Sequence, residues 1–98
     1  MAEESAAGIV VAGSIFLAPG TRDAFLSRSS SAISQARKTP GCLDFCVSAD
    51  TLQEDRVNIF ELWSSRAALD GFRDTGPSDD LVTLIVRADV TEYIVDIG

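Results

Sequence analysis

The sequence predicts an α+β fold in which helices cover one face of a four-stranded antiparallel sheet. The first observation is the order of hydrophobic patterns along the chain: strand, helix, strand, strand, helix, strand. The second is that Pro19-Gly20, Pro40-Gly41 and Gly76-Pro77 each lie where one pattern stops and another begins. The third is size, because 98 residues, 46% of them hydrophobic, suffice for one core and are too few for two. We therefore expect a single domain over residues 1–98, with residues 1–7 disordered.

The first strand is predicted over residues 8–18, which are rich in valine, isoleucine and phenylalanine and apolar on both faces. A helix follows, because Thr21 can cap it and Asp23 lies in its first turn. Its apolar and small residues recur at helical spacing: Phe25, Ser29, Ala32, Ile33 and Ala36. The helix is expected to end at Arg37 and Lys38, where the macrodipole favours cations.

Two strands joined by a hairpin come next. Residues 41–49 alternate apolar and polar side chains, residues 50–55 form a polar loop, and residues 56–64 alternate again. In the third strand one face carries Val57, Ile59, Glu61 and Trp63, and the other carries Asn58, Phe60 and Leu62. This alternation predicts that Glu61 and Trp63 point the same way.

A second helix is predicted from a serine cap at Ser64 or Ser65 to Thr75. A short third helix follows over residues 78–85, with a strand as the alternative there. The last strand is predicted over residues 88–97. This order of elements is the ferredoxin-like split βαβ pattern, an antiparallel sheet with helices on one face.

The second face of the predicted sheet has no helix left to cover it. That face carries Phe60 and Leu62, and the first strand is apolar on both of its faces. Because a water-exposed apolar sheet face is unfavourable, we expect two copies of the chain to pack these faces together as a homodimer.

Composition excludes several classes of function. The chain has no histidine, so histidine-based triads, zinc sites and haem ligation are not expected. Eight Lys and Arg against 15 Asp and Glu give a net charge of -7, which disfavours nucleic acid as a partner. Cys42 and Cys46, about 13 Å apart on one face of a strand, are too distant for a disulfide and too few for a metal site. No nucleotide-binding fingerprint occurs, so neither a metal nor a cofactor is expected.

The amino terminus carries acidic residues where a secretory signal requires lysine or arginine. The apolar run over residues 9–18 is about half of the ~20 residues that cross a bilayer. The two cysteines are expected to be small apolar residues in a reducing compartment. We therefore expect a cytoplasmic protein with no membrane partner.

Three segments, in this order and spacing, resemble the antibiotic biosynthesis monooxygenase family: residues 12–25 (AGSIFLAPGTRDAF), 39–45 (TPGCLDF) and 60–69 (FELWSSRAAL). The resemblance runs nearly end to end and implies a dimeric α/β barrel, in which two ferredoxin-like sheets close against one another. The haem-degrading branch of the family is excluded by the lack of histidine, and Gly13 stands where that branch has an asparagine. Phe72 replaces a histidine that many other members carry.

The resemblance implies a cofactor-independent monooxygenase that uses dioxygen to oxidise a hydrophobic aromatic small molecule, polyketide- or quinol-like. The alternative is a non-catalytic small-molecule-binding or assembly module on the same dimeric scaffold. The lack of histidine and the small number of acid–base groups favour this alternative.

Trp63, the only tryptophan, and Glu61 are the first candidates for the site. Trp63 can stack on an aromatic substrate, or it can pack the third strand on the second helix, and the two roles are compatible. Glu61 can act as a base if it is buried, because burial raises the pKa of a carboxyl. A structural ion pair with Arg22, Arg66 or Arg73 is the favoured alternative for Glu61.

Four further residues complete the predicted site. Tyr93 is a candidate catalytic group and Asn58 a candidate substrate-binding group, because either can hydrogen-bond a phenolate oxygen. Phe72, two turns into the second helix, is expected to wall a pocket beside Trp63. Arg87 could neutralise an anionic intermediate, although a lone surface arginine is the commoner case.

Overall fold

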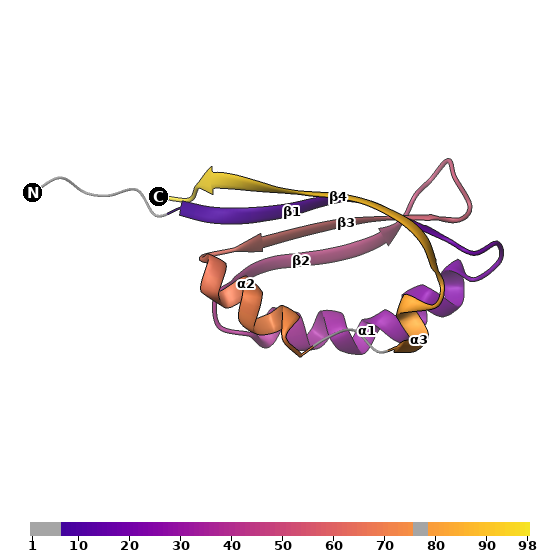
Figure 1. Ribbon diagram of the computed structural model, residues 1–98, viewed down its shortest axis with the longest axis horizontal. Coiled ribbons are helices and arrows are strands. Elements are labelled where there is room, and N and C mark those ends of the chain that lie inside the picture. Colours follow the sequence, from indigo (N-terminus) through magenta and orange to yellow (C-terminus); the bar gives the residue numbers. More distant parts are fainter. Residues whose placement is uncertain (1–6, 76–78) are drawn as a thin grey trace, which may run out of the picture.

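The chain forms a four-stranded antiparallel sheet with its helices on one face, as the sequence predicts (Figure 1). The computed structural model describes residues 7–75 and 79–98. The elements are β1 (Ala7–Leu17), α1 (Arg22–Lys38), β2 (Cys42–Ala49), β3 (Arg56–Trp63), α2 (Arg66–Arg73), α3 (Asp79–Val82) and β4 (Ile85–Asp96). The strand order is β2-β3-β1-β4, which with this element order is the ferredoxin-like α+β fold.

The pairing register sorts the strand residues into two faces. Directly paired residues of antiparallel strands point to the same side, so each row across the sheet belongs to one face. Two rows lie on the face beneath which the helices pack: Trp63, Ile9 and Ile94 in one, and Glu61, Val11 and Glu92 in the next. We call this the helix-covered face. The opposite, open face carries Val10, Ala12 and Phe16 of β1, Phe60 and Leu62 of β3, and Tyr93 and Val95 of β4.

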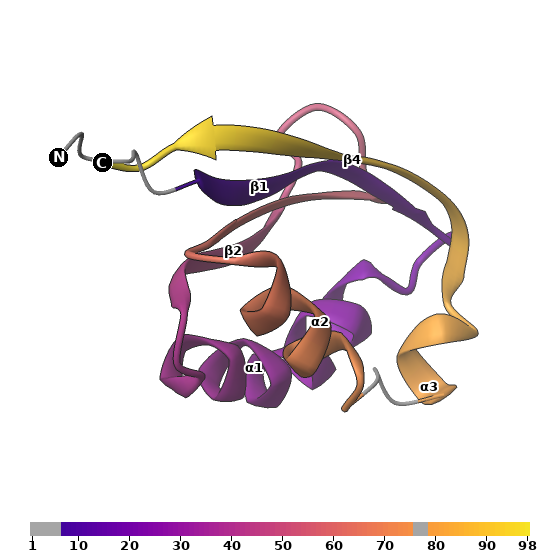
Figure 2. The same ribbon diagram turned by 60° about the vertical axis from the view of Figure 1, so that its left-hand side comes forward.

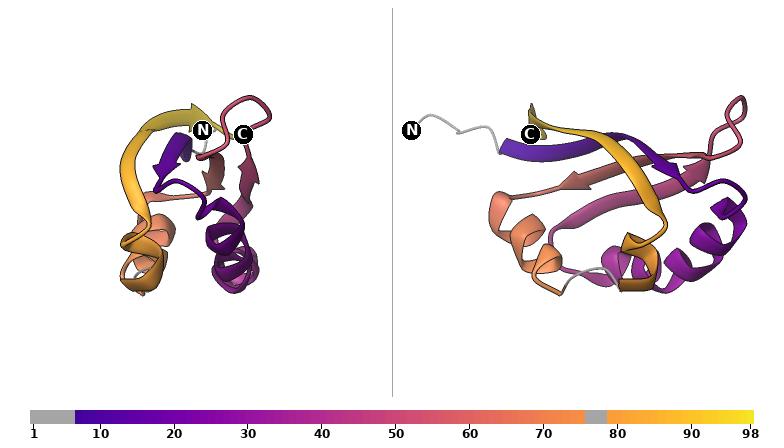
Figure 3. Two further views of the ribbon diagram at one scale, coloured as in Figure 1. Left: turned by 90° about the vertical axis from the view of Figure 1, so that its right-hand side faces the viewer. Right: turned by 45° about the vertical axis from the view of Figure 1, so that its right-hand side comes forward.

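Two clusters of buried side chains attach the helices to the sheet. The first contains Ile9, Val11, Ala36, Phe45, Trp63 and Leu69. The second contains Leu17, Phe25, Val57 and Leu81. Figure 2 shows the three helices on one side of the sheet, and seen end-on α1 lies under its β2 side, whereas α2 and α3 lie under its β4 side (Figure 3). Burial of these apolar surfaces is the main force that holds the two layers together.

The turns next to α2 follow the chemistry predicted for them. Gly41 has a φ of +91°, and a Cβ built on it would lie 2.4 Å from the Cβ of Ala68. Only glycine tolerates both conditions, so β2 can begin close against α2. The Ser65 hydroxyl accepts a hydrogen bond from Ala68 N at 3.1 Å, which makes Ser65 the N-cap of α2.

The start of α1 differs from the prediction. The side chain of Thr21 does not cap α1 and instead donates to the carbonyl of Ala18 at 2.7 Å.

A register shift in β2 corrects the prediction for the two cysteines. Between Cys42 and Asp44 the pairing of β2 with β3 slips by one residue. Cys42 therefore lies opposite Trp63 on the helix-covered face, whereas Cys46 lies opposite Phe60 on the open face. The two thiols are free and do not share a face, contrary to the prediction.

The last strand begins earlier than predicted, at Ile85, because Leu17 of β1 pairs with it across a register shift in which Val86 of β4 is the extra residue. The third predicted helix is confirmed as the four residues Asp79–Val82. The second helix ends at Arg73, two residues before the predicted end at Thr75. The Gly76-Pro77 pair predicted to terminate it lies outside the described residues, as does the predicted disorder of residues 1–7 except for Ala7, which opens β1. No helix in the described part of the chain is long and apolar enough to cross a membrane.

Candidate functional site

Trp63 ends β3 inside the first buried cluster, and its side chain is 0% exposed. The ring of Phe72 lies 5.3 Å from the Trp63 ring, centroid to centroid, and the ring of Phe45 lies 6.4 Å away in an edge-on contact. Phe45 and Phe72 also meet, with centroids 5.6 Å apart. The three rings form one aromatic cluster that joins β2, β3 and α2. Trp63 thus has the packing role that was one of its two predicted roles, and its ring is fully covered.

Glu61 lies one row along the helix-covered face from Trp63, as the strand alternation predicts. It is half-buried, and its Oε1 accepts a hydrogen bond from Trp63 Nε1 at 2.9 Å. Burial raises the pKa of Glu61 above its ordinary value. The hydrogen bond from Trp63 and the charge of Arg73 act against this rise, and the charge of Glu92 adds to it. Among residues 7–75 and 79–98, the second oxygen of Glu61 has no hydrogen-bond partner.

The ion pair expected for Glu61 is replaced by another arrangement. The guanidinium of Arg22 donates to backbone carbonyls in and beside the loop after β2, the nearest at 2.9 Å. Arg66 Nη2 lies 2.8 Å from Glu92 Oε1, and Arg73 Nη1 lies 2.6 Å from Glu92 Oε2. Both arginines of α2 therefore bind the carboxylate of β4, and the prediction that one of them pairs with Glu61 is wrong.

Glu92 on β4 binds the two arginines of α2. It lies across Val11 from Glu61, so the two carboxyls share a row of the helix-covered face. Hydrogen bonds from Arg66 and then Arg73 lower the pKa of Glu92. The double ion pair ties the helix to the edge strand, a link that the sequence does not predict because it depends on the register of β4 against β1.

The helix-covered face is accessible along β4. Val90 is 36% exposed and Ile94 is 70% exposed, whereas Ile9, the neighbour of Ile94 on β1, is 3% exposed. The helices therefore bury the β1 and β3 part of this face and leave the β4 part open. We call the accessible strip of Val90, Glu92 and Ile94 the inner wall of β4. It is apolar at both ends and charged in the middle. Glu61 lies in the same row as Glu92, with Val11 of β1 between them.

The structure places the other predicted polar residues on the open face. Tyr93 lies opposite Val10 and is 51% exposed, so the prediction that it contacts the same ligand as Trp63 is wrong for a single chain. The reason is parity, because Tyr93 neighbours Glu92 on β4 and successive strand residues point to opposite faces. Phe72, in contrast, lies beside Trp63 as predicted.

Asn58 and Arg87 have structural partners on the open face. Asn58 Nδ2 donates to Asp50 Oδ1 at 2.9 Å, and Asn58 Oδ1 accepts from Arg56 Nε at 2.8 Å. The hydrogen bond from Asn58 is the largest of the contributions that lower the pKa of Asp50 to about 2. Arg87 lies over the ring of Phe16, 4.2 Å from its centroid, and pairs with Asp89. Neither side chain reaches the Trp63 cluster.

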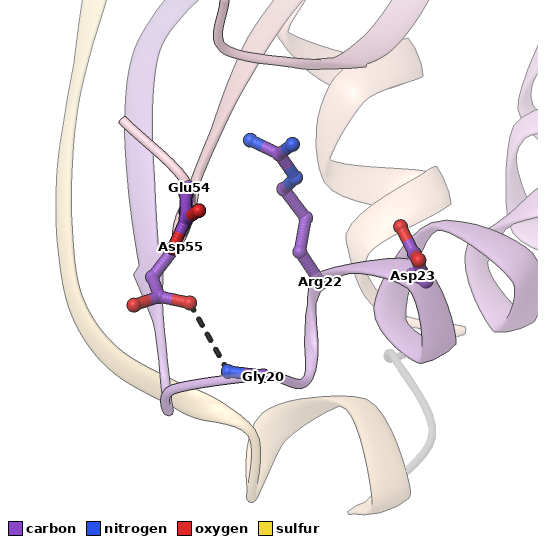
Figure 4. A pocket seen from close by; sticks show the side chains of 5 residues that line it. All are labelled: Gly20, Arg22, Asp23, Glu54 and Asp55. Atoms are coloured by element: carbon purple, nitrogen blue, oxygen red, sulfur yellow. Dashed lines mark hydrogen bonds between the residues drawn. The ribbon is translucent and has the colours of Figure 1, made fainter. Parts of the chain in front are cut away.

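Two shallow hollows lie elsewhere on the surface. One is lined by Gly20, Arg22, Asp23, Glu54 and Asp55, where the loop after β2 meets the start of α1 (Figure 4). Gly20 N donates to Asp55 Oδ1 there at 3.1 Å. The other runs along α1 and is lined by Ser30, Ile33, Ser34, Arg37 and Lys38. Neither hollow contains a predicted site residue, and the first lies at the opposite end of β3 from Trp63.

The fold agrees with the comparison with known families. The chain belongs to the antibiotic biosynthesis monooxygenase family, which it matches over residues 8–83. Membership of this family supports a monooxygenase-like function. A curated relative, an uncharacterised protein of Synechocystis sp., is 37% identical over 62 residues, which cover 63% of this chain and 42% of the relative. The chain thus spans less than half of the length of that relative.

Solved structures share the fold. A conserved protein from Methanosarcina mazei has 21% sequence identity and a TM-score of 0.72, with 94% of this chain and 93% of that chain covered. A candidate antibiotic biosynthesis monooxygenase from Caulobacter crescentus has 18% identity and a TM-score of 0.72, with 96% of this chain and 92% of that chain covered. At these identities the likeness shows a common architecture.

Proposed function

We propose that the chain is a cofactor-independent monooxygenase that oxidises a hydrophobic aromatic small molecule, polyketide- or quinol-like, with dioxygen. The observation that carries this proposal is the half-buried Glu61, held at one oxygen by Trp63 and lying on the same face of the sheet as the accessible inner wall of β4. Family membership supports the class of reaction. A carboxyl whose pKa is raised by burial is a stronger base when ionised than a solvated one.

The chemistry required of the protein is proton removal. Glu61 takes a proton from an acidic O–H or C–H group of the substrate, and the resulting anion transfers an electron to dioxygen. The substrate radical and superoxide combine to a peroxide anion, which takes back the proton from Glu61 and becomes a hydroperoxide. Loss of water from the hydroperoxide leaves a carbonyl, as when an anthrone becomes an anthraquinone. One oxygen atom enters the product and the other leaves in water. A ligand bound against Val90 and Ile94 would displace water from beside Glu61, which favours this sequence.

In this proposal Trp63 is a positioning residue. Its ring is covered, so it acts through the hydrogen bond that fixes the Glu61 carboxyl. The ligand rests against Val90 and Ile94, whose side chains are open, and Phe72 supports the aromatic cluster from α2. The substrate therefore contacts Glu61 and the inner wall of β4 and does not contact the ring of Trp63.

Oxygen uptake and product mass test the proposal, with anthrones and dihydroxynaphthalenes as substrates and with protein treated to remove metals. We expect uptake that depends on the protein, and a product that has gained one oxygen and lost two hydrogens. Glu61→Gln should lower kcat by about 10²-fold or more, the usual contribution of a general base. Glu54→Gln, an exposed carboxylate in the loop after β2, is the matched control and should leave kcat unchanged.

Two results would contradict the proposal. Tight binding of these compounds without oxygen uptake would identify a non-catalytic binding module, which was the alternative predicted from the sequence. Equal activity of Glu61→Gln and the unmodified chain would remove Glu61 from the reaction.

A further inference from the structure

The helix α1 carries unpaired positive charge in an otherwise acidic chain. It holds four of the eight lysines and arginines and one of the 15 carboxylates. Arg28, Arg37 and Lys38 are exposed and form no ion pair among residues 7–75 and 79–98. The carboxyl end of a helix carries about half a negative charge, which is less than the two cations in the last turn of α1 supply. The surplus positive charge is free to attract a carboxylate of another molecule.

The opposite end of α1 has surplus negative charge. The hollow there places Asp23, Glu54 and Asp55 around a single cation, Arg22 (Figure 4). The guanidinium of Arg22 donates to backbone carbonyls and pairs with none of these carboxylates. Asp55 accepts a hydrogen bond from Gly20 N, but the described part of the chain offers no partner to Asp23 or Glu54. The amino end of the helix attracts about half a negative charge, so these carboxylates also exceed what the helix requires.

Both hollows lie along the flank of α1 that is next to β2. Near the end of the helix, Arg37 Nε donates to the carbonyl of Phe45 on β2 at 2.9 Å. At its start, Arg22 donates to carbonyls in and beside the loop after β2. Asp23, Ser30 and Arg37 are spaced by seven residues, about two helical turns, so they follow one line along this flank. The flank is therefore acidic at one end and basic at the other.

The basic hollow, of about 480 Å³, has the form of a hole for helix packing. Four of its lining residues stand at positions i, i+3, i+4 and i+7, which surround a knob side chain from a facing helix: Ser30, Ile33, Ser34 and Arg37. The Ser30 hydroxyl already donates to the carbonyl of Ser27 at 2.9 Å, so covering it leaves no donor unsatisfied. Because serine is small, a second helix can approach α1 closely here.

We propose that this flank of α1 binds the same flank of a second copy of the chain, with the two helices antiparallel. A two-fold axis beside Ser30 places Arg37 of each copy opposite Asp23 of the other, since both lie seven residues from Ser30. The same axis places the half-buried Leu26 of the second copy over the hole. A parallel arrangement would bring like charges together, so the charges select the antiparallel one.

The contact is small and separate from the candidate active site. A helix of 17 residues is about 25 Å long and about 10 Å wide, which gives a contact below the size of stable interfaces. We therefore expect association that is absent at micromolar concentration and present near millimolar concentration. Since α1 lies under the β2 side of the sheet, the contact competes neither with the open face nor with the inner wall of β4 (Figure 3).

Sedimentation equilibrium up to about 1 mM protein, at low ionic strength, tests the contact. We expect the mass of the species found at micromolar concentration to double, and salt at about 0.5 M to reverse the doubling. Arg37→Glu and Asp23→Arg should each weaken the association at least tenfold, because each places like charges opposite one another. The double variant restores opposite charges and should return the association to within about threefold of the unmodified chain. It cannot restore the hydrogen bond to Phe45, so recovery reports the pairing of the two copies.

Arg28→Glu is the matched control, because it makes the same change of charge on an exposed arginine of α1. Arg28 lies two residues before Ser30, about 200° around the helix and away from the flank, so the association should stay unchanged. Equal weakening by Arg28→Glu and Arg37→Glu would show a general effect of net charge and would overturn the inference. An unmodified chain whose mass stays constant up to about 1 mM would also overturn it, as would a double variant that is folded by circular dichroism and does not associate.

Discussion

Glu61 and Glu92 occupy equivalent positions on either side of Val11, yet their surroundings shift their pKa values in opposite directions. Burial raises the pKa of Glu61, whereas Arg66 and Arg73 lower that of Glu92. The folded chain thus binds the Glu61 proton more tightly than the unfolded chain does. The stability of the fold must then fall as pH rises from the ordinary glutamate value of 4.5 through the raised pKa. Glu61→Gln should abolish that decrease, so the variant gains stability relative to the unmodified chain as pH rises.

Glu92→Gln provides the comparison of opposite sign. The ion pairs of Glu92 stabilise the fold above the ordinary carboxyl pKa and are lost as pH falls through the lowered one. The destabilisation caused by Glu92→Gln should therefore be largest near neutral pH and shrink in acid. Urea unfolding at a series of pH values, followed by the fluorescence of Trp63, measures both dependences. Slopes of the same sign in the two variants would contradict the assigned environments.

For single residues, the sequence predicts the contacts that follow from the alternation of side chains along one strand. Glu61 and Trp63 share a face because they are two residues apart on one strand, and Phe72 meets Trp63 because a short helix follows the strand. The partners of Glu92 could not be predicted, because they depend on how a distant strand is registered against β1. Tyr93 was misplaced for the same reason, since both faces of β4 mix apolar and polar residues.

The helix that lies beside the candidate site is α2. It has eight residues, too few to be stable as an isolated helix, so it depends on its cap, on Leu69 in the core and on the ion pairs with β4. Ser65→Ala removes the side-chain acceptor for Ala68 N and should lower the free energy of unfolding by about 1 kcal/mol. Ser64→Ala, one residue before the cap, is the control and should cost less. Urea titration of both variants distinguishes the two serines, which the sequence left as alternatives.

Most element boundaries follow from local chemistry, which is why they could be predicted. The Pro19-Gly20 and Pro40-Gly41 pairs mark real turns, and the positive φ of Gly41 shows the physical reason for one of them. The register shift at Cys42 has no such local signal. It arises where β2 pairs with β3 and changes which face each cysteine occupies. A strict alternation of side chains predicts both cysteines on one face, and this prediction is wrong.

At the scale of the whole molecule, the open face of the sheet is an apolar surface that no described helix covers. The three helices all lie on the other side of the sheet, as Figure 2 shows. The open face presents Phe60 and Tyr93 with 37% and 51% of their surfaces exposed, and Leu62 beside them. A second copy of the chain carries the complementary apolar face by symmetry, so we propose a homodimer in which the two open faces pack together.

Phe60→Asp tests this assembly, because it places a charge in the middle of the open face, between Ala12 of β1 and Cys46 of β2. In a dimer that charge would be buried without a partner at a cost of several kcal/mol, so we expect dissociation or unfolding. Leu52→Asp is the matched control, since Leu52 is 92% exposed in the loop after β2 and should tolerate the same charge. Sedimentation velocity at micromolar concentration reports the outcome, with circular dichroism to separate a folded monomer from an unfolded chain. A monomeric unmodified chain, or a Phe60→Asp variant that sediments as a dimer, would show that the open face is not the interface.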